Sequence, residues 1–241
     1  MPASERVRTL ANLDRGERRV VLLRSPLFQA MTEDELDATL KFAVERHWPK
    51  NASIFQKGDD GSSLMAVLKG RVKISAVSSE GKEVTLNVIE PGNIFGEIAL
   101  LDGNPRSADA TALDDAVLLV VDRRHFLPFV RANGDLYLRL LAVLCERLRR
   151  TSMALEDLAL FDLPARLARL LLKMAEDYGR PATGGVRIDM KMSQRDISTL
   201  VASTRESVNK QLQLWRRGGV LELDGGYIVL CRSADLRALV A

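Results

Sequence analysis

The chain has 241 residues, of which 46% are hydrophobic, 28% charged and 5% aromatic. This length is enough for one large domain or two small ones with a buried core. No stretch without Asp, Glu, Lys or Arg exceeds eight residues, whereas a membrane-spanning helix needs about 18 or more apolar residues. The N-terminus, Met1 to Arg6, is charged and lacks the apolar stretch of a secretory signal. We therefore expect a soluble, cytoplasmic protein with no membrane partner.

The formal net charge of +3 is unevenly distributed along the chain. Residues 1–163 carry 22 Lys and Arg against 24 Asp and Glu, whereas residues 164–241 carry 13 against 8. The first two thirds are therefore slightly acidic, and the last third has a net charge of +5. A basic C-terminal third favours a nucleic-acid-binding module in that part of the chain.

A β domain is predicted in the first half of the chain. Thr32 and Glu35 form a capping box, which predicts a short helix up to about Ala43. Between about residues 42 and 122, short apolar segments such as 64–68, 72–77 and 84–89 are separated by turns rich in Gly, Asp and Pro. Strands that recur every 8–12 residues or so predict a β-sandwich or barrel. The Arg-rich residues 1–25 are expected to form a solvated or partly helical arm.

A long helix is predicted from about Asp135 to Leu160. Six of its residues follow an uninterrupted 3-4 spacing, namely Leu141, Leu144, Leu148, Thr151, Leu155 and Leu158. This pattern is typical of a helix that packs along a partner helix, although a helix lying on its own domain would also show it. Asp162 and Pro164 interrupt the pattern, because proline is tolerated in the first turn of a helix but not in its interior. We expect a hinge and a domain boundary at these two residues.

The last third of the chain has the outline of a winged helix-turn-helix. A helix is predicted from Arg166 to Tyr178, with apolar residues at helical spacing. Residues 193–196 and 203–206 both have the form Ser-x-x-acid, which marks two helix starts only ten residues apart. Residues 221–223 and 227–230 then flank the turn Asp224-Gly225-Gly226, which predicts a β-hairpin.

Residues 94–108, IFGEIALLDGNPRSA, gather groups suited to a cyclic phosphodiester and its sugar. Arg106 offers a bidentate cationic fork, and Ser107 adds a hydroxyl and a backbone N–H. The N–H groups of a short helical turn after Gly96 would attract an anion. The carboxylate of Glu97 can accept from a sugar hydroxyl. Each of these residue types is common at surfaces, so the prediction depends on their combination.

The second helix of the predicted helix-turn-helix shows two contrasting faces. Val208, Leu212 and Trp215 share one face, while four polar residues gather on the other near the helix start, namely Arg205, Glu206, Asn209 and Lys210. The N-terminal residues of a recognition helix contact base edges in the major groove. Arg and Lys suit guanine, Glu accepts from cytosine, and Asn suits adenine. A solvated face with a Glu206–Lys210 pair is the alternative interpretation.

These motifs together resemble the CRP/FNR superfamily of cyclic-nucleotide-responsive transcription regulators, over about residues 26–235. The resemblance implies an α+β fold in which residues 26–132 form a cyclic-nucleotide-binding β-roll, a double-stranded β-helix. Residues 133–162 would be the dimerisation helix and hinge. Residues 163–241 would be the winged helix-turn-helix DNA-binding domain, and residues 1–25 an N-terminal arm.

The resemblance also implies roles in nucleotide binding. Residues 95–97 and 105–108 look like the phosphate-binding cassette of the family, in which Glu97 would hold the ribose and Arg106 with Ser107 the cyclic phosphate. Gly96, Ile98 and Ala99 would complete this ligand site. Thr151 would bond the purine within its own subunit, and Ser152 would reach the nucleotide of the partner subunit. Cyclic AMP is the first choice of ligand and cyclic GMP the second, and no prosthetic group is expected.

For DNA binding, residues 204–208 are similar to the family's recognition-helix start. Arg205, Glu206 and Lys210 would read bases, with Asn209 beside them. Ser193, Gln194 and Thr204 are likewise expected to be DNA-binding residues, and the resemblance gives Ser193 and Thr204 phosphate contacts. Two residues depart from the best-known pattern, because Lys210 replaces an arginine and Ala202 replaces the turn glycine. Lysine is a point donor rather than a fork, so the half-site would differ or be read more loosely.

The expected protein is a homodimer, with no catalytic activity, whose recognition helices enter successive major grooves roughly 34 Å apart on near-palindromic DNA. RNA polymerase is a further expected partner. His47 and His125 have no nucleophile at a recognisable spacing, and two isolated cysteines cannot hold an iron–sulfur cluster. Two alternatives remain open. One is a ligand-independent DNA-binding regulator with a degenerate pocket, and the other is a non-transcriptional nucleotide-binding module.

Overall fold

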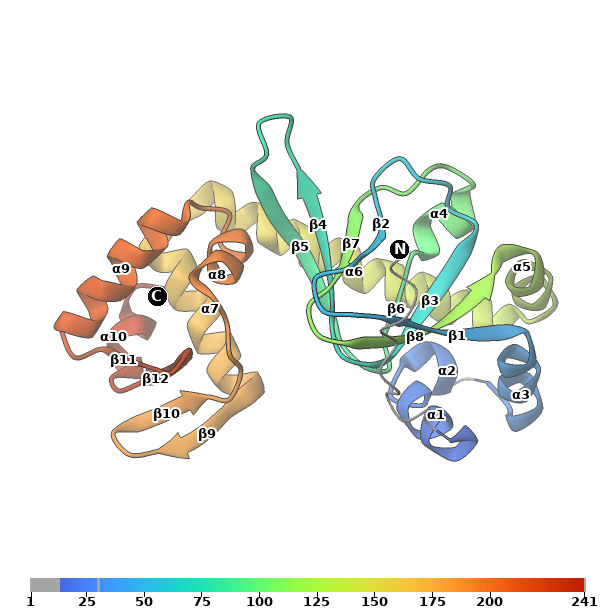
Figure 1. Ribbon diagram of the computed structural model, residues 1–241, viewed down its shortest axis with the longest axis horizontal. Helices are drawn as coiled ribbons and strands as arrows, with labels where there is room; N and C mark the ends of the chain where they lie inside the picture. The colour runs from blue at the N-terminus through green and yellow to red at the C-terminus, as the bar shows by residue number, and fades with distance from the viewer. Residues whose placement is uncertain (1–13, 30, 241) are drawn as a thin grey trace, which may run out of the picture. The chain divides into compact units, whose positions relative to one another are not determined.

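The computed structural model describes residues 14–29 and 31–240 as an α+β protein (Figure 1). The chain divides into two compact units, Met1–Ile74 with Asn87–Cys145, and Ser75–Leu86 with Glu146–Ala241. Within the described ranges, no helix combines the length and apolar character needed to cross a bilayer. The predicted combination of a β-rich N-terminal part, a long helix and a C-terminal helix-turn-helix is confirmed.

Two four-stranded sheets form the β-roll. One has the order β1-β8-β3-β6, with β1 at Ala43–Trp48, β8 at Ala116–Asp122, β3 at Ser63–Lys69 and β6 at Ile94–Phe95. The other has the order β2-β7-β4-β5, with β2 at Ser53–Phe55, β7 at Asp109–Ala112, β4 at Val72–Val77 and β5 at Glu83–Ile89. All three strand segments expected from the sequence, 64–68, 72–77 and 84–89, are strands here.

Strand β3 shows why its sequence is a continuous apolar run rather than an alternating one. Met65 and Val67 pack into a core shared with β4, β5, β6, β7 and β8. Leu64, Ala66 and Leu68 point to the opposite face and pack against the helices. Because successive side chains of a strand point to opposite faces, a strand covered on both faces needs apolar residues at every position.

In the described part of the first unit, five helices accompany the start of the long helix: α1 (Arg15–Leu22), α2 (Pro26–Gln29), α3 (Glu33–Phe42), α4 (Glu97–Asp102) and α5 (Arg123–Ala132). The predicted capping box at Thr32 and Glu35 is present at the start of α3. The N-terminal arm is partly helical, as predicted, since α1 lies in it, but it is not solvated at Leu22, which is fully buried in the core. Residues 1–13 of that arm lie outside the described residues.

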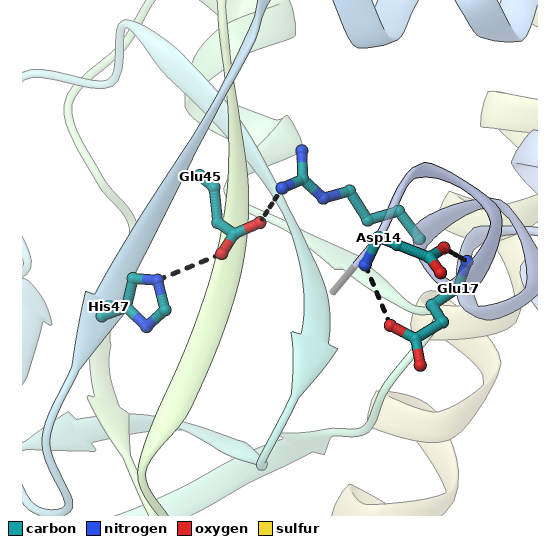
Figure 2. A network of polar contacts seen from close by, with 5 residues as sticks. Asp14, Glu17, Glu45 and His47 are labelled. Carbon is teal, nitrogen blue, oxygen red and sulfur yellow. Dashed lines mark hydrogen bonds and ion pairs between the residues drawn. The ribbon is translucent and has the colours of Figure 1, made fainter. Parts of the chain in front are cut away.

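A polar network joins α1 to the edge strand β1 (Figure 2). Glu45 lies 2.8 Å from a guanidinium nitrogen of Arg18 and 3.1 Å from Nε2 of His47. Asp14 and Glu17 form a reciprocal capping box at the start of α1 (Figure 2). The other histidine, His125, stacks on Phe42 with ring centroids 4.7 Å apart. Both histidines therefore have structural contacts.

The long helix α6 runs from Gly134 to Leu160, as predicted to within one residue at its start. Its buried residues are Leu136 and Leu140, near the N-terminal end. By contrast, four leucines of the predicted seam, Leu141, Leu148, Leu155 and Leu158, are between 44% and 67% exposed. The seam therefore does not serve to pack the helix onto its own domain, which was the alternative interpretation.

The second unit contains the predicted helix-turn-helix and wing. Helix α7 (Leu163–Tyr178) begins with Asp162 as its N-cap and Pro164 in its first turn. Helices α8 (Gln194–Leu200) and α9 (Arg205–Arg217) follow, and then the hairpin of β11 (Leu221–Asp224) and β12 (Tyr227–Leu230). Sequence analysis missed the hairpin of β9 (Gly179–Ala182) and β10 (Gly185–Ile188), and also α10 (Ser233–Ala238). Strands of four residues that contain Gly or Pro give no periodic signal, and here β10 is stabilised by pairing with β12 and β9 by pairing with β10.

Candidate functional site

The segment 94–108 passes from a strand through a short helix into a loop. Strand β6 ends at Phe95, Gly96 adopts a left-handed backbone with φ of +79°, and α4 begins at Glu97. A Cβ atom at position 96 would lie 2.6 Å from Nη1 of Arg106 and 3.2 Å from the Ser63 carbonyl oxygen. Glycine is therefore required here both by the backbone conformation and by the close approach of the arginine.

The guanidinium of Arg106 is held in a socket of backbone and side-chain oxygens. Nη1 donates to the Gly96 carbonyl at 2.8 Å, and Nη2 donates to the carbonyl and hydroxyl of Ser63 at 2.9 and 3.0 Å. The Phe55 ring lies against the guanidinium, with its centroid 4.3 Å from Cζ. These contacts fix the side chain in position and satisfy most of its donors, as a charged residue that is only 4% exposed requires.

Arg106 also has a donor to spare. Its Nε is buried and has no hydrogen-bond acceptor among the described residues. Burial lowers the pKa of Arg106, while the charges of Glu97 and Asp59 act in the opposite direction. A buried cation that keeps a free N–H is suited to an anion with strong acceptor oxygens.

The other predicted ligand residues flank this socket. Glu97 is fully buried at the start of α4, and its negative charge acts to raise the pKa of Arg106 against the effect of burial. Ala99 is buried because the loop residue Gly61 approaches it so closely that a Cβ at position 61 would lie 2.1 Å from the Ala99 Cβ. Ile98 is 44% exposed, and Ser107 is also exposed. The segment therefore presents one buried cation, one buried carboxylate and an exposed hydroxyl.

Sequence analysis did not find Ser63, Phe55 or Gly61. These residues come from β3, from β2 and from the loop between them, more than 30 residues before the motif. Their types are common in strands and loops, so no local pattern marks them. Backbone hydrogen bonds of Arg106 to Gly58 and Asp59, together with the pairing of β3 with β6, bring Ser63 close to Arg106.

Thr151 and Ser152 are exposed on α6, in the second unit. The Thr151 hydroxyl donates to the Arg147 carbonyl at 2.9 Å, one turn earlier in the same helix. Its proton is therefore engaged, while its oxygen lone pairs remain available. The predicted contacts of Thr151 and Ser152 with a purine remain predictions.

The helix-turn-helix presents the polar face expected from the sequence. Val208, Leu212 and Trp215 are buried in the core of the second unit. Arg205, Glu206 and Lys210 are exposed, and Asn209 is half-buried. Helix α9 has Thr204 as its N-cap, so Ser203, proposed as the start of that signature, is not the cap. Ser193 caps α8 in a reciprocal capping box with Asp196, as predicted.

The turn before α9 has an unusual backbone. Ala202 has φ of +48°, in the left-handed region that favours glycine. By the resemblance stated above, the family has a glycine at this position, and Ala202 adopts the same left-handed region. The sharp turn is compatible with a side chain at position 202, but with backbone strain.

Comparisons with known proteins agree with this division of the chain. A family model described as a cyclic nucleotide-binding domain matches residues 45–133, and one described as a Crp-like helix-turn-helix domain matches residues 165–239. The first match contains the whole segment 94–108, and the second contains α8, α9 and the wing.

Similar proteins cover almost the whole chain. A CRP-like cAMP-activated global transcriptional regulator of Mycobacterium tuberculosis is 31% identical, over 90% of this chain and 96% of the relative. A cyclic AMP receptor protein of Thermus thermophilus is 31% identical, over 89% and 96%. The solved structure of the c-di-GMP-responsive global regulator CLP of Xanthomonas campestris has the same fold, with a TM-score of 0.75 and 22% identity, over 83% of this chain and 99% of that one.

The strained turn leads to a prediction about stability. Replacement Ala202→Gly should raise the free energy of unfolding by roughly 0.5–1 kcal/mol, because glycine adopts a positive φ without a Cβ clash. The measurement is urea unfolding of the full chain followed by the fluorescence of Trp215, with Trp48 replaced by Phe. The control is Ala175→Gly inside α7, which should lower stability by about 1 kcal/mol. A loss of stability in Ala202→Gly would contradict the assignment of strain to this turn.

Proposed function

The chain belongs to the CRP/FNR family of DNA-binding transcription regulators, and we propose that it is a homodimer whose DNA binding is controlled by a cyclic nucleotide. The observation that carries this proposal is the Arg106 socket, in which a buried cation keeps a free Nε hydrogen. A cyclic phosphodiester carries one negative charge and strong acceptor oxygens, and it would satisfy both the charge and the donor.

The neighbouring groups support a nucleotide rather than a simple inorganic anion. Glu97 is buried beside the socket and can only accept hydrogen bonds when ionised, so it suits a ribose hydroxyl. Ser107 is exposed next to Arg106 and offers a hydroxyl to the phosphate. Gly96, Ile98 and Ala99 would line the same site through the first turn of α4. The two relatives named above, at 31% identity, carry cyclic AMP in their names, which adds support for this ligand.

Thr151 favours cyclic AMP over cyclic GMP. Because the Thr151 proton is engaged by the Arg147 carbonyl, its oxygen acts only as an acceptor toward a ligand. Adenine presents an amino group at its 6-position, which donates, whereas guanine presents a carbonyl oxygen there, which accepts. If Thr151 contacts the purine, as the resemblance implies, it bonds adenine and leaves guanine unsatisfied. Ser152 would contact the nucleotide of the partner subunit.

The exposed seam of α6 supports a dimer. Leucines at Leu141, Leu148, Leu155 and Leu158 lie on one face of the helix at heptad spacing and stay exposed in the single chain. A second copy of the helix would bury this face as a coiled coil. Two recognition helices would then bind a near-palindromic DNA site, with Asp162 and Pro164 as the hinge. RNA polymerase is the further partner that a transcription regulator of this kind would contact.

Control by the ligand would work through differential affinity. A nucleotide that binds one arrangement of the dimer more tightly shifts the population toward it, and this arrangement would be the one that binds DNA. A regulator with a degenerate pocket would bind DNA equally well with and without nucleotide. A nucleotide-binding module without a transcriptional role would bind the nucleotide but no specific DNA.

The nucleotide site is tested by isothermal titration calorimetry of the full chain with cyclic AMP, cyclic GMP and adenosine 5′-monophosphate. We expect cyclic AMP to bind most tightly, and Arg106→Ala to weaken it by about 10- to 100-fold, since hydrogen bonds to charged groups contribute about 1.5–3 kcal/mol. The control is Arg71→Ala, which removes an arginine that pairs with Asp114 on the same β-roll. Unchanged affinity in a folded Arg106→Ala protein would contradict the site assignment.

The dimer is tested by analytical ultracentrifugation. Leu155→Asp should convert the dimer to a monomer at micromolar concentration, because it places two carboxylates in the apolar seam. Met153→Asp, on the opposite side of the same helix and also exposed, is the matched control and should leave the dimer intact. Dissociation by both substitutions, or by neither, would argue against this seam as the interface.

The DNA-reading face is tested by selecting binding sites from a randomised DNA library with the full chain, with and without cyclic AMP. Arg205→Ala should relax the base preference at one position of each half-site, with a loss of about 1–3 kcal/mol on the preferred sequence. A uniform loss of affinity across all sequences would instead identify Arg205 as a phosphate contact.

A further inference from the structure

A hydrogen bond between two carboxamides joins the two helices of the helix-turn-helix. Nε2 of Gln194, the first residue of α8, donates to Oδ1 of Asn209 in α9 at 2.8 Å. We propose that Gln194 is a positioning residue that fixes the Asn209 carboxamide to read an adenine in each half-site. This inference rests on the DNA-reading role proposed above for α9.

With Gln194 as the donor, the bond selects one of two orientations of the Asn209 amide. Rotation of the Asn209 amide alone by 180° would bring its NH₂ group against the NH₂ group of Gln194, and two donors cannot bond each other. Rotation of both amides together would be opposed once the second Nε2 hydrogen of Gln194 donates to a DNA phosphate oxygen, because that oxygen can only accept. With Oδ1 held toward Gln194, one lone pair of this oxygen is engaged and the second remains free. The two hydrogens of Nδ2 also remain free. Asn209 can therefore still offer one acceptor and one donor side by side.

This combination matches adenine among the four bases. In the major groove, adenine presents a donor at N6 and an acceptor at N7, and a carboxamide bonds both at once. Guanine presents two acceptors, so the oxygen of a fixed amide would face another oxygen. A freely rotating asparagine would discriminate less, because it could turn its NH₂ group toward either kind of acceptor.

The hydroxyls of the neighbouring cap residues have no free proton to donate to DNA, whereas the amide pair does. The Ser193 hydroxyl donates to Asp196 Oδ2 at 2.6 Å, and the Thr204 hydroxyl donates to Ser207 Oγ at 2.8 Å. Both protons are therefore engaged in the helix caps. Gln194, by contrast, retains a second Nε2 hydrogen, which can donate to a phosphate oxygen and tie the amide pair to the DNA backbone.

The position of Asn209 predicts where the adenine lies in the half-site. Asn209 follows Arg205 by one helical turn on the same face of α9, so their Cβ atoms are about 5–6 Å apart. Successive bases along a DNA strand are spaced by about 3.4 Å. The adenine should therefore lie within two base pairs of the base that Arg205 reads.

The test uses the full chain and the half-site obtained from the randomised library, with all four bases compared at each position. At one position we expect the wild-type protein to prefer adenine by at least about fivefold, the lower limit for a bidentate contact. Both Asn209→Ala and Gln194→Leu should reduce this preference to below twofold. The double variant should lose no more than Asn209→Ala does, because the two side chains act as one unit.

A change in the preferred base shows whether the Gln194–Asn209 pair orients a base contact or only packs between the helices. In Asn209→Asp, Gln194 still donates to the side chain, but the donor to N7 is lost and only acceptors remain. The preference at that position should move from adenine to cytosine, whose N4 amino group donates. The matched controls are Gln211→Leu and Gln211→Glu, the same kinds of change on a different face of α9. These controls should alter affinity evenly for all sequences and leave the base preference unchanged.

The possible results distinguish a failure of this inference from a failure of the proposed DNA-reading role of α9. If Gln194→Leu lowers affinity evenly and keeps the adenine preference, Gln194 has only a structural role and the inference is wrong. The inference is also wrong if Asn209→Ala alters the base preference at a position where adenine is not preferred. It is wrong as well if Asn209→Ala alters the preference at no position while Arg205→Ala alters it at one. If the wild-type protein shows no base preference at all, the DNA-reading role of α9 fails, and the inference fails with it.

Discussion

The N-terminal site depends on the burial of one cation, Arg106. A guanidinium is stable in a protein interior only when its hydrogen bonds are satisfied and negative charge lies nearby. The chain meets most of this demand with two backbone carbonyls, the Ser63 hydroxyl and the Phe55 ring, together with the charges of Glu97 and Asp59. It leaves the Nε hydrogen without an acceptor among the described residues. A phosphodiester would supply that acceptor, and this unsatisfied donor is the physical basis for the proposed ligand binding.

In the second unit, by contrast, the polar residues proposed to contact DNA stay at least partly exposed, and hydrogen bonds order several of their side chains. The caps of α8 and α9 engage the hydroxyls of Ser193 and Thr204, and the Gln194–Asn209 bond orients an amide that would otherwise rotate. Ordering these side chains before DNA arrives reduces the entropy lost on binding. Ala202 lies in the turn between the two helices with a positive φ, a conformation that a glycine would adopt without strain.

Helix α6, which lies between these two sites in the sequence, carries an apolar face that the single chain does not bury. Exposed leucines at Leu148 and Leu155 would be unfavourable in water for an isolated chain, and their heptad spacing fits a second helix. Thr151 lies in the same seam with its proton engaged by Arg147. One helix thus combines the features proposed for dimerisation and for recognition of the base, and these two roles would couple ligand binding to the arrangement of the dimer.

The sequence alone determined the local features, because these depend on residues close together in the chain. They include the capping boxes, the strands between residues 63 and 89, the long helix, the break at Asp162 and Pro164, and the segment 94–108. Only the tertiary structure decided which distant residues meet. Ser63 and Phe55 contact Arg106 in the folded chain, and Leu22 of the supposed arm enters the core. Strand β10 forms by pairing with β12, and β9 forms by pairing with β10. Such contacts depend on pairing and burial between segments far apart in the chain, and no local pattern records them.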